Sequence, residues 1–150
     1  MKDPDRVAAH TAESTNAWIK RAAERRVARH AADKKPALTR RIQELENEWD
    51  IERYLEMNAS ALAFTGVMLG LFKDRRFFLV PCLVLPFLFQ HAVQGWCPPI
   101  PFFRKRGVRT RREIETEKNA LKALRGDFGD VSATAAPRER ARAAWQAANR

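Results

Sequence analysis

The chain has 150 residues, of which 45% are apolar and 31% charged, and its 28 Lys and Arg exceed its 18 Asp and Glu to give a net charge of +10. Six Gly and two Cys exclude a disulfide-rich scaffold, a collagen-like repeat and a glycine-dense phosphate-binding loop. The apolar residues are concentrated, since eight of the nine Phe lie between Phe64 and Phe103. From Met57 to Phe103 every formal charge falls within residues 73–76. This concentration predicts a membrane protein rather than an ordinary soluble domain.

The charges are also distributed unevenly along the chain. Residues 1–56 hold 12 basic and 11 acidic side chains, whereas residues 104–150 hold 13 basic and six acidic ones. The first 15 residues contain five charges and no apolar run, which is unlike a secretory signal. We therefore expect the first apolar segment to serve as an uncleaved membrane anchor.

Residues 1–35 are predicted to form a solvated helix, because they are rich in Ala, Arg and Glu and contain no Gly or Pro between Asp5 and Asp33. Pro36 is expected to end that helix. A short amphipathic helix is predicted over 36–53 from apolar residues spaced by four, three and four positions. These residues are Leu38, Ile42, Leu45 and Trp49. We expect the stripe to lie on a neighbouring helix, and the seam of a parallel dimer is the alternative.

Residues 54–103 predict a transmembrane helical hairpin, with helices at about 55–72 and 77–97. The second of these has 21 residues and no formal charge. At 1.5 Å per residue it would extend about 31 Å, close to the roughly 30 Å thickness of the bilayer's hydrocarbon core. A hairpin buried in a soluble protein is the alternative, but the other segments carry too little apolar surface to cover it. The sequence therefore predicts an all-α integral membrane protein with helical arms at both ends.

The basic residues next to the two apolar helices predict the orientation of the hairpin. The turn Lys73–Arg76 has three of them, and nine lie on the other side. By the positive-inside rule, both termini are expected in the cytoplasm. Six of the nine form a run without an acidic residue: Arg104, Lys105, Arg106, Arg109, Arg111 and Arg112. We expect this run to bind anionic lipid headgroups. Nucleic acid is the less favoured partner, because no aromatic residues are interleaved with these charges.

The remainder of the chain, 104–150, is predicted as a basic cytoplasmic tail. It contains a helix at about 111–125, because Thr110 and Glu113 have the spacing of a capping box. Gly126 is expected to stop that helix.

Four residues near the proposed cytoplasmic mouth of the hairpin form a candidate polar cluster: Asn58, His91, Gln94 and Cys97. Polar side chains are costly in a bilayer unless they are paired, so we expect them to face one another or another subunit. One interpretation is structural, with hydrogen bonds that hold the helices together. The other is functional, with a proton relay or a ligand site. The basic residues near Cys97 would favour its thiolate, and a structural role for this thiol is the alternative. We expect no metal site and no cofactor.

A row of small residues on the first apolar helix is predicted to be a helix-packing surface. It consists of Ala59, Ala63, Gly66 and Gly70. Small side chains let two helices approach closely, and packing drives association in lipid. The partner is either the second helix of the same chain or a second copy in a homodimer.

Residues 50–103 resemble the YgaP-like inner-membrane transmembrane domain, a bacterial two-helix domain of unknown function. The matching residues are Glu52-Arg53-Tyr54-Leu55, Gly66 with Gly70, and Gly95-Trp96-Cys97-Pro98. The resemblance implies a self-associating hairpin in the bacterial inner membrane with cytoplasmic termini. Some members carry a rhodanese sulfurtransferase domain, which has no counterpart here.

Together these features predict a small bacterial inner-membrane protein that acts as an anchor or interaction module, without an assignable reaction and with an unidentified protein partner. Thiol chemistry at Cys97 is the one reaction left open. Two alternatives remain: a small transporter or sulfur-handling accessory, and a membrane tether associated with nucleic acid.

Overall fold

The computed structural model describes residues 5–129, 131 and 136–148, and within these residues it contains helices and no strands, which confirms the all-α prediction. The elements, in chain order, are α1 (Arg6–Ala9), α2 (Glu13–Arg29), α3 (Lys35–Glu46), α4 (Ile51–Phe72), the 3₁₀ helix η1 (Arg75–Phe78), α5 (Leu79–Gln94), α6 (Ile100–Lys105), α7 (Arg111–Arg125) and α8 (Pro137–Ala148).

The chain divides into two compact units. The first combines Met1–Ile19 with Trp49–Arg112, and the second combines Lys20–Glu48 with Glu113–Arg150. The first unit therefore holds both long apolar helices, and the second holds α3, α8 and most of α2 and α7.

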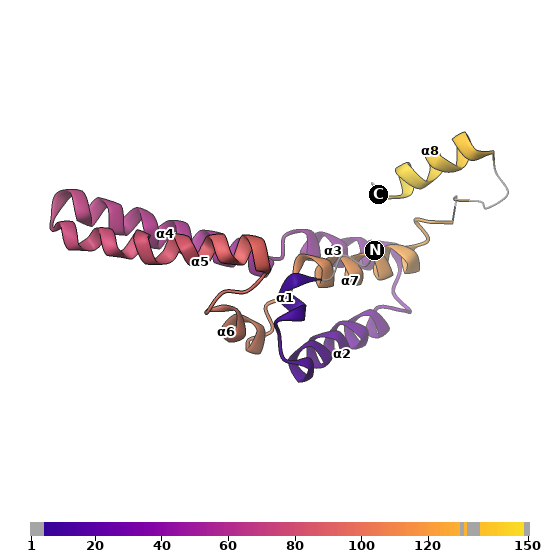
Figure 1. Ribbon diagram of the computed structural model, residues 1–150. Helices are drawn as coiled ribbons and strands as arrows, with labels where there is room; N and C mark the ends of the chain where they lie inside the picture. Colours follow the sequence, from indigo (N-terminus) through magenta and orange to yellow (C-terminus); the bar gives the residue numbers. More distant parts are fainter. Residues whose placement is uncertain (1–4, 130, 132–135, 149–150) are drawn as a thin grey trace. The chain divides into compact units, whose positions relative to one another are not determined.

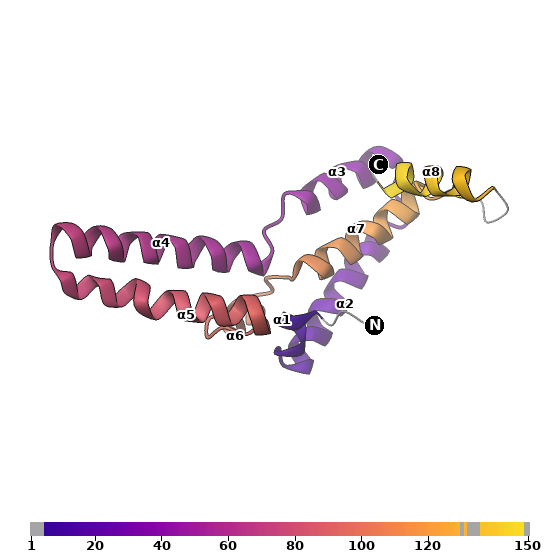
Figure 2. The same cartoon turned by 45° about the horizontal axis from the view of Figure 1, so that its top comes forward.

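Helices α4 and α5 of the first unit lie side by side and are joined at one end by a short loop, as Figures 1 and 2 show. Helix α4 begins after Asp50, whose side chain accepts a hydrogen bond of 2.8 Å from the Arg53 backbone N–H. At the loop, the Asp74 side chain accepts a bond of the same length from Arg76 N–H and caps η1. A hairpin of two adjacent apolar helices is thus present.

The second helix of the hairpin is shorter than the predicted range 77–97. The chain is 3₁₀-helical up to Phe78, and α5 ends at Gln94. The reason for the early end is Gly95, which adopts a left-handed φ of 75° and donates its N–H to the carbonyl of His91. A glycine in this conformation commonly terminates a helix.

The contact between α4 and α5 depends on two buried glycines. A Cβ atom on Gly66 would lie 2.6 Å from Pro81 Cδ and 2.8 Å from Val80 Cβ. A Cβ on Gly70 would lie 3.0 Å from the ring of Phe78. At Gly66 and Gly70 the packing surface predicted on the first helix therefore receives the second helix of the same chain.

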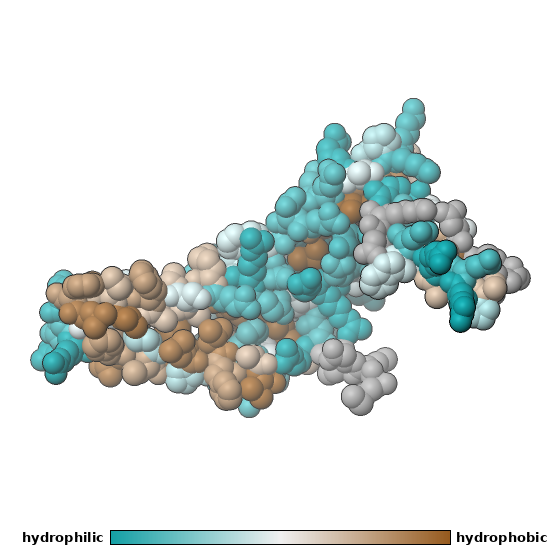
Figure 3. Space-filling model, turned by 90° about the horizontal axis from the view of Figure 1, so that it is seen from above, coloured by the Kyte–Doolittle hydropathy of each residue, from teal (hydrophilic) through white to brown (hydrophobic). Residues whose placement is uncertain are grey.

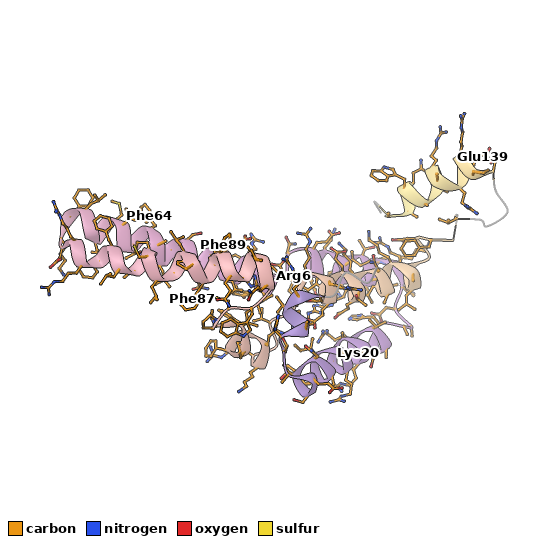
Figure 4. The ribbon with its side chains drawn as sticks, in the orientation of Figure 1. Arg6, Lys20, Phe64, Phe87, Phe89 and Glu139 are labelled. Atoms are coloured by element: carbon orange, nitrogen blue, oxygen red, sulfur yellow. The ribbon has the colours of Figure 1, made fainter. Side chains whose placement is uncertain are left out.

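The outer surface of the hairpin is apolar, as the brown region over α4 and α5 in Figure 3 shows. Large side chains project from it, among them Phe64 and Phe89 (Figure 4), which are 67% and 72% exposed. Two segments, Lys35–Phe72 and Arg75–Gln94, are long and apolar enough to cross a membrane. Only 17% and 11% of the apolar 18-residue stretches within them are buried. A core helix of a soluble protein would be mostly buried instead.

The second unit has its own apolar core between α3 and α7. Leu38, Ile42 and Leu45 of α3 are buried in one cluster with Ile114 and Leu121 of α7. The stripe predicted on the short amphipathic helix thus lies against a neighbouring helix of the same chain, as expected.

A buried ion cluster joins α2, α3 and α7 within this unit. The Glu117 side chain is fully buried and pairs with Arg26 at 2.8 Å and with Arg41 at 3.0 Å. Each of the three residues comes from a different helix, so the cluster fixes the helices relative to one another.

Two helices of the N-terminal region are broken where the sequence predicted continuity. The range 1–35 divides at residues 10–12, because the Asn16 amide donates to the carbonyls of Ala8 and Thr11 and closes a turn there. The range 36–53 divides at residues 47–50, because Asp50 begins a new helix. Trp49 consequently leaves the predicted stripe.

Candidate functional site

The base of the hairpin, where α4 begins and α5 ends, is closed by a small apolar core. Val7 of α1 is buried there with Ile51 and Leu55 of α4 and with Cys97 and Ile100 beyond α5. The N-terminal segment thus packs directly on the end of the hairpin, although it is about 45 residues away from α4 in sequence.

Polar contacts hold α1 in this position. Arg6 Nη1 donates a hydrogen bond of 2.5 Å to the carbonyl of Ala92, in the last turn of α5. The final carbonyls of a helix lack intrahelical partners and carry partial negative charge, so a cation is favourable there. Thr110 Oγ1 donates to Asp5 Oδ2, and the backbone N–H of Ile51 donates to the carbonyl of Arg109 at 2.9 Å. These contacts join α1, α4 and the segment before α7.

The basic run that follows the hairpin separates into buried and exposed members. Arg104 is 0% exposed, and its guanidinium donates to the Val108 carbonyl at 3.1 Å and to Asn16 Oδ1 at 2.8 Å. Arg109 is also buried, at 4% exposed. This corrects their prediction as headgroup-binding residues, because a buried guanidinium cannot reach a lipid phosphate. The exposed members are Lys105, Arg106, Arg111 and Arg112.

The predicted polar cluster is not assembled in the structure. Asn58 is exposed, and its amide donates to the carbonyl of Tyr54 on its own helix at 2.7 Å. Gln94 accepts a bond of 3.3 Å from Gln90, also within one helix. His91 is 9% exposed, and its Nδ1 has no hydrogen-bond partner among the described residues. Helical neighbours satisfy these amides locally, so the cross-helix bonds that the sequence suggested do not form.

Cys97 lies in the apolar core at the base and is 7% exposed. Burial raises the pKa of this thiol, because the apolar surroundings disfavour the thiolate. The expectation that nearby basic residues favour the thiolate is therefore wrong. The guanidinium of Arg104 is engaged elsewhere, and burial is the controlling effect at Cys97.

Cys97 is expected to react slowly with thiol reagents. At pH 7.5 its alkylation by iodoacetamide in a Cys82→Ser background should be at least about tenfold slower than that of an exposed thiol, because the raised pKa and the burial both reduce accessible thiolate. The rate should rise only as the pH approaches the raised pKa. A reference thiol is Glu24→Cys in a Cys82→Ser, Cys97→Ser chain, since Glu24 is exposed on α2. Equal rates for the two thiols at pH 7.5 would contradict this assignment.

A groove of about 390 Å³ runs along the hairpin next to its base. It is formed by α4, α5 and the segment 97–103, and Phe87 lies on the side of α5 that contributes to it (Figure 4). Its lining includes Leu55, Ala59, Leu62, Phe87, Cys97 and Phe102. Asn58 also lines it, so two members of the predicted cluster share the groove without a bond between them.

Three aromatic residues, Trp49, Tyr54 and Phe103, lie next to one another at the base of the hairpin. Tyr54 lies 5.3 Å from Trp49 and 5.6 Å from Phe103, measured between ring centroids. The guanidinium of Arg53 lies 4.4 Å from the centre of the Trp49 ring. Rings that contact both apolar surface and a cation are typical of a boundary between an apolar and an aqueous region.

The fold and this site define a class of protein: a helical chain with two adjacent apolar helices of membrane length and helical segments closed over their base. No family model, curated protein or solved structure matches the chain. The resemblance to the YgaP-like domain therefore remains a prediction.

The residues that position α1 were not identified from the sequence. Asp5, Arg6 and Asn16 lie in a charged leader and Thr110 lies within a basic run, where polar residues are usually solvated. Helix α6 was also missed, although Pro99 and Pro101 gave a usable signal, since proline suits the first turn of a helix.

Proposed function

We propose that the protein is a small membrane anchor of the bacterial inner membrane, with α4 and α5 across the bilayer and the remaining helices in the cytoplasm. The observation that supports this proposal is the exposed apolar surface of two adjacent helices of membrane length. In water this surface would drive association, whereas lipid covers it at no cost.

The charges near the hairpin support the orientation. The loop end carries Lys73, Arg75 and Arg76, whereas the base is followed by a longer basic run. Lys and Arg accumulate on the cytoplasmic side, so the base and both arms are assigned to the cytoplasm. The aromatic residues Trp49 and Tyr54 are then placed at the interface that such residues favour.

The structure of the second unit favours an anchor that carries a folded module over an anchor with unstructured tails. Its apolar core and the buried Glu117 cluster give it a defined structure of its own. A module of this kind offers a fixed surface to a partner at the membrane. Transport is less favoured, because Asn58 and Gln94 bond within their own helices.

Cysteine labelling tests whether the loop of the hairpin and the N-terminal arm lie on opposite sides of the bilayer. In a Cys82→Ser, Cys97→Ser background, Lys73→Cys marks the loop and Glu24→Cys marks the N-terminal arm. A charged maleimide that cannot cross membranes should label Lys73→Cys in right-side-out vesicles and Glu24→Cys only in inside-out vesicles. Labelling of both positions from the same side would contradict the proposed topology, because the two ends of the hairpin would then share one compartment.

A further inference from the structure

The groove beside α6 has an apolar wall that continues into exposed positive charge. Phe102 lines the groove, and the guanidinium of Arg106 lies 3.8 Å from the centre of its ring. Residues 102 and 106 are one helical turn apart, so they lie on the same side of the chain. Lys105 and Arg106 are both exposed. The apolar groove thus ends, within one helical turn, next to the cations Lys105 and Arg106.

This polarity matches that of a phospholipid, in which an acyl chain is joined to a phosphate. We propose that the groove binds the acyl chain of an anionic phospholipid, with its phosphate at Arg106 and Lys105. The inference rests on the proposed position of the hairpin in a membrane, since only there does the groove open to lipid. It adds a discrete lipid site to the general attraction between basic residues and a charged membrane surface.

The dimensions of the groove favour an acyl chain over a helix of a second copy. A helix with its side chains is about 10–12 Å across, so a second copy could place side chains in a groove of about 390 Å³ but not its backbone. An acyl chain is narrower and can extend along it. The volume also lies within the range of about 300–1,000 Å³ that is typical of small-molecule sites.

The chemistry of the lining agrees with an apolar occupant. The Asn58 amide donates to the Tyr54 carbonyl, and burial raises the pKa of the Cys97 thiol, which favours its neutral form. Specificity must therefore come from the charged end of the groove. Arg106 can hold the phosphate through bidentate hydrogen bonds, and its positive charge favours a headgroup of net negative charge over a zwitterionic one that carries the same phosphate.

The test measures lipids retained by the full chain. The protein is reconstituted in nanodiscs of equal parts dioleoylphosphatidylglycerol and dioleoylphosphatidylcholine, released, and examined by native mass spectrometry. We expect one retained lipid, with phosphatidylglycerol favoured about fivefold over phosphatidylcholine, since Arg106, the cation next to the groove, contributes about that factor. Arg106→Gln should abolish most of this preference. Arg75→Gln, at the exposed loop, is the matched control and should keep it.

A second pair of variants tests the groove itself. Ala59→Phe should fill it and lower retention of both lipids severalfold, whereas Ala61→Phe, on the exposed side of α4, should retain lipid as the wild type does. Equal retention of the two lipids by the wild type would overturn the headgroup assignment. Unchanged retention by Ala59→Phe would overturn the groove assignment.

The two proposals can fail separately. If the wild type retains no lipid but stays in the membrane pellet after alkaline extraction, the lipid site is wrong and the anchor proposal stands. If the wild type is released into the supernatant, both proposals are wrong.

Discussion

Substitution of Gly66 by Leu should lower the free energy of unfolding of the hairpin by about 1–3 kcal/mol, the usual cost of overpacking a close contact. The new Cβ would lie 2.6 Å from Pro81 Cδ and 2.8 Å from Val80 Cβ. Neither neighbour can move freely, because Pro81 belongs to a rigid ring and the Val80 Cβ is attached to the helix backbone. Helices α4 and α5 would therefore have to separate. Titration of SDS into detergent micelles, followed by tryptophan fluorescence, measures the loss.

Thr65→Leu is the matched control for Gly66→Leu. Thr65 is the preceding residue and is exposed, so the same side chain is added without a collision. Its effect should stay within about 0.5 kcal/mol. A Gly66→Leu variant as stable as Thr65→Leu would mean that α4 and α5 do not meet at this glycine.

Replacement of the buried Glu117 by Leu should destabilise the second unit by about 3 kcal/mol. The side chain of Glu117 is fully buried between Arg26 and Arg41, which are 25% and 20% exposed. Removal of the carboxylate leaves two largely buried cations close together, and breaking a buried pair costs about 3–5 kcal/mol. The lower end applies because both guanidinium groups retain some contact with water. Amide hydrogen exchange of α3 should become about a hundredfold faster.

Two further variants serve as controls for Glu117→Leu. Glu115→Ala removes a partly exposed ion pair with Lys118 on the same helix, in which the side chains are 42% and 15% exposed, and should cost about 1 kcal/mol or less. A triple replacement, Arg26→Met, Arg41→Met and Glu117→Leu, should recover most of the stability, because an apolar cluster can substitute for a buried ionic one. Exchange in Glu117→Leu no faster than in Glu115→Ala would contradict the assignment of Glu117 as the central contact of α2, α3 and α7.

The sequence predicted those features that depend on composition and periodicity. The hairpin followed from the absence of charge across two long segments, and α7 was expected at about 111–125, where the structure has Arg111–Arg125. The apolar stripe at Leu38, Ile42 and Leu45 correctly indicated a buried face, although its partner on α7 is about 70 residues away. Patterns within one helix are local, so a single sequence is sufficient to detect them.

The features that the sequence did not predict depend on contacts between distant segments. Nothing in the run from Arg104 to Arg112 distinguishes the buried Arg104 from the exposed Arg106. The difference arises because Asn16, 88 residues away, supplies an acceptor for Arg104. The hydrogen bond from Arg6 to the Ala92 carbonyl of α5 likewise joins segments that are far apart in the sequence. The candidate cluster was misjudged for a different reason, since amides such as Asn58 can bond to the preceding turn of their own helix.

Alkaline carbonate extraction of membranes that contain the full chain tests most directly whether lipid covers the surface of α4 and α5. We expect the wild type to stay in the membrane pellet at high pH and to be released only by detergent. A folded, monomeric chain in the detergent-free supernatant would contradict it, because the exposed apolar surface would then be compatible with water.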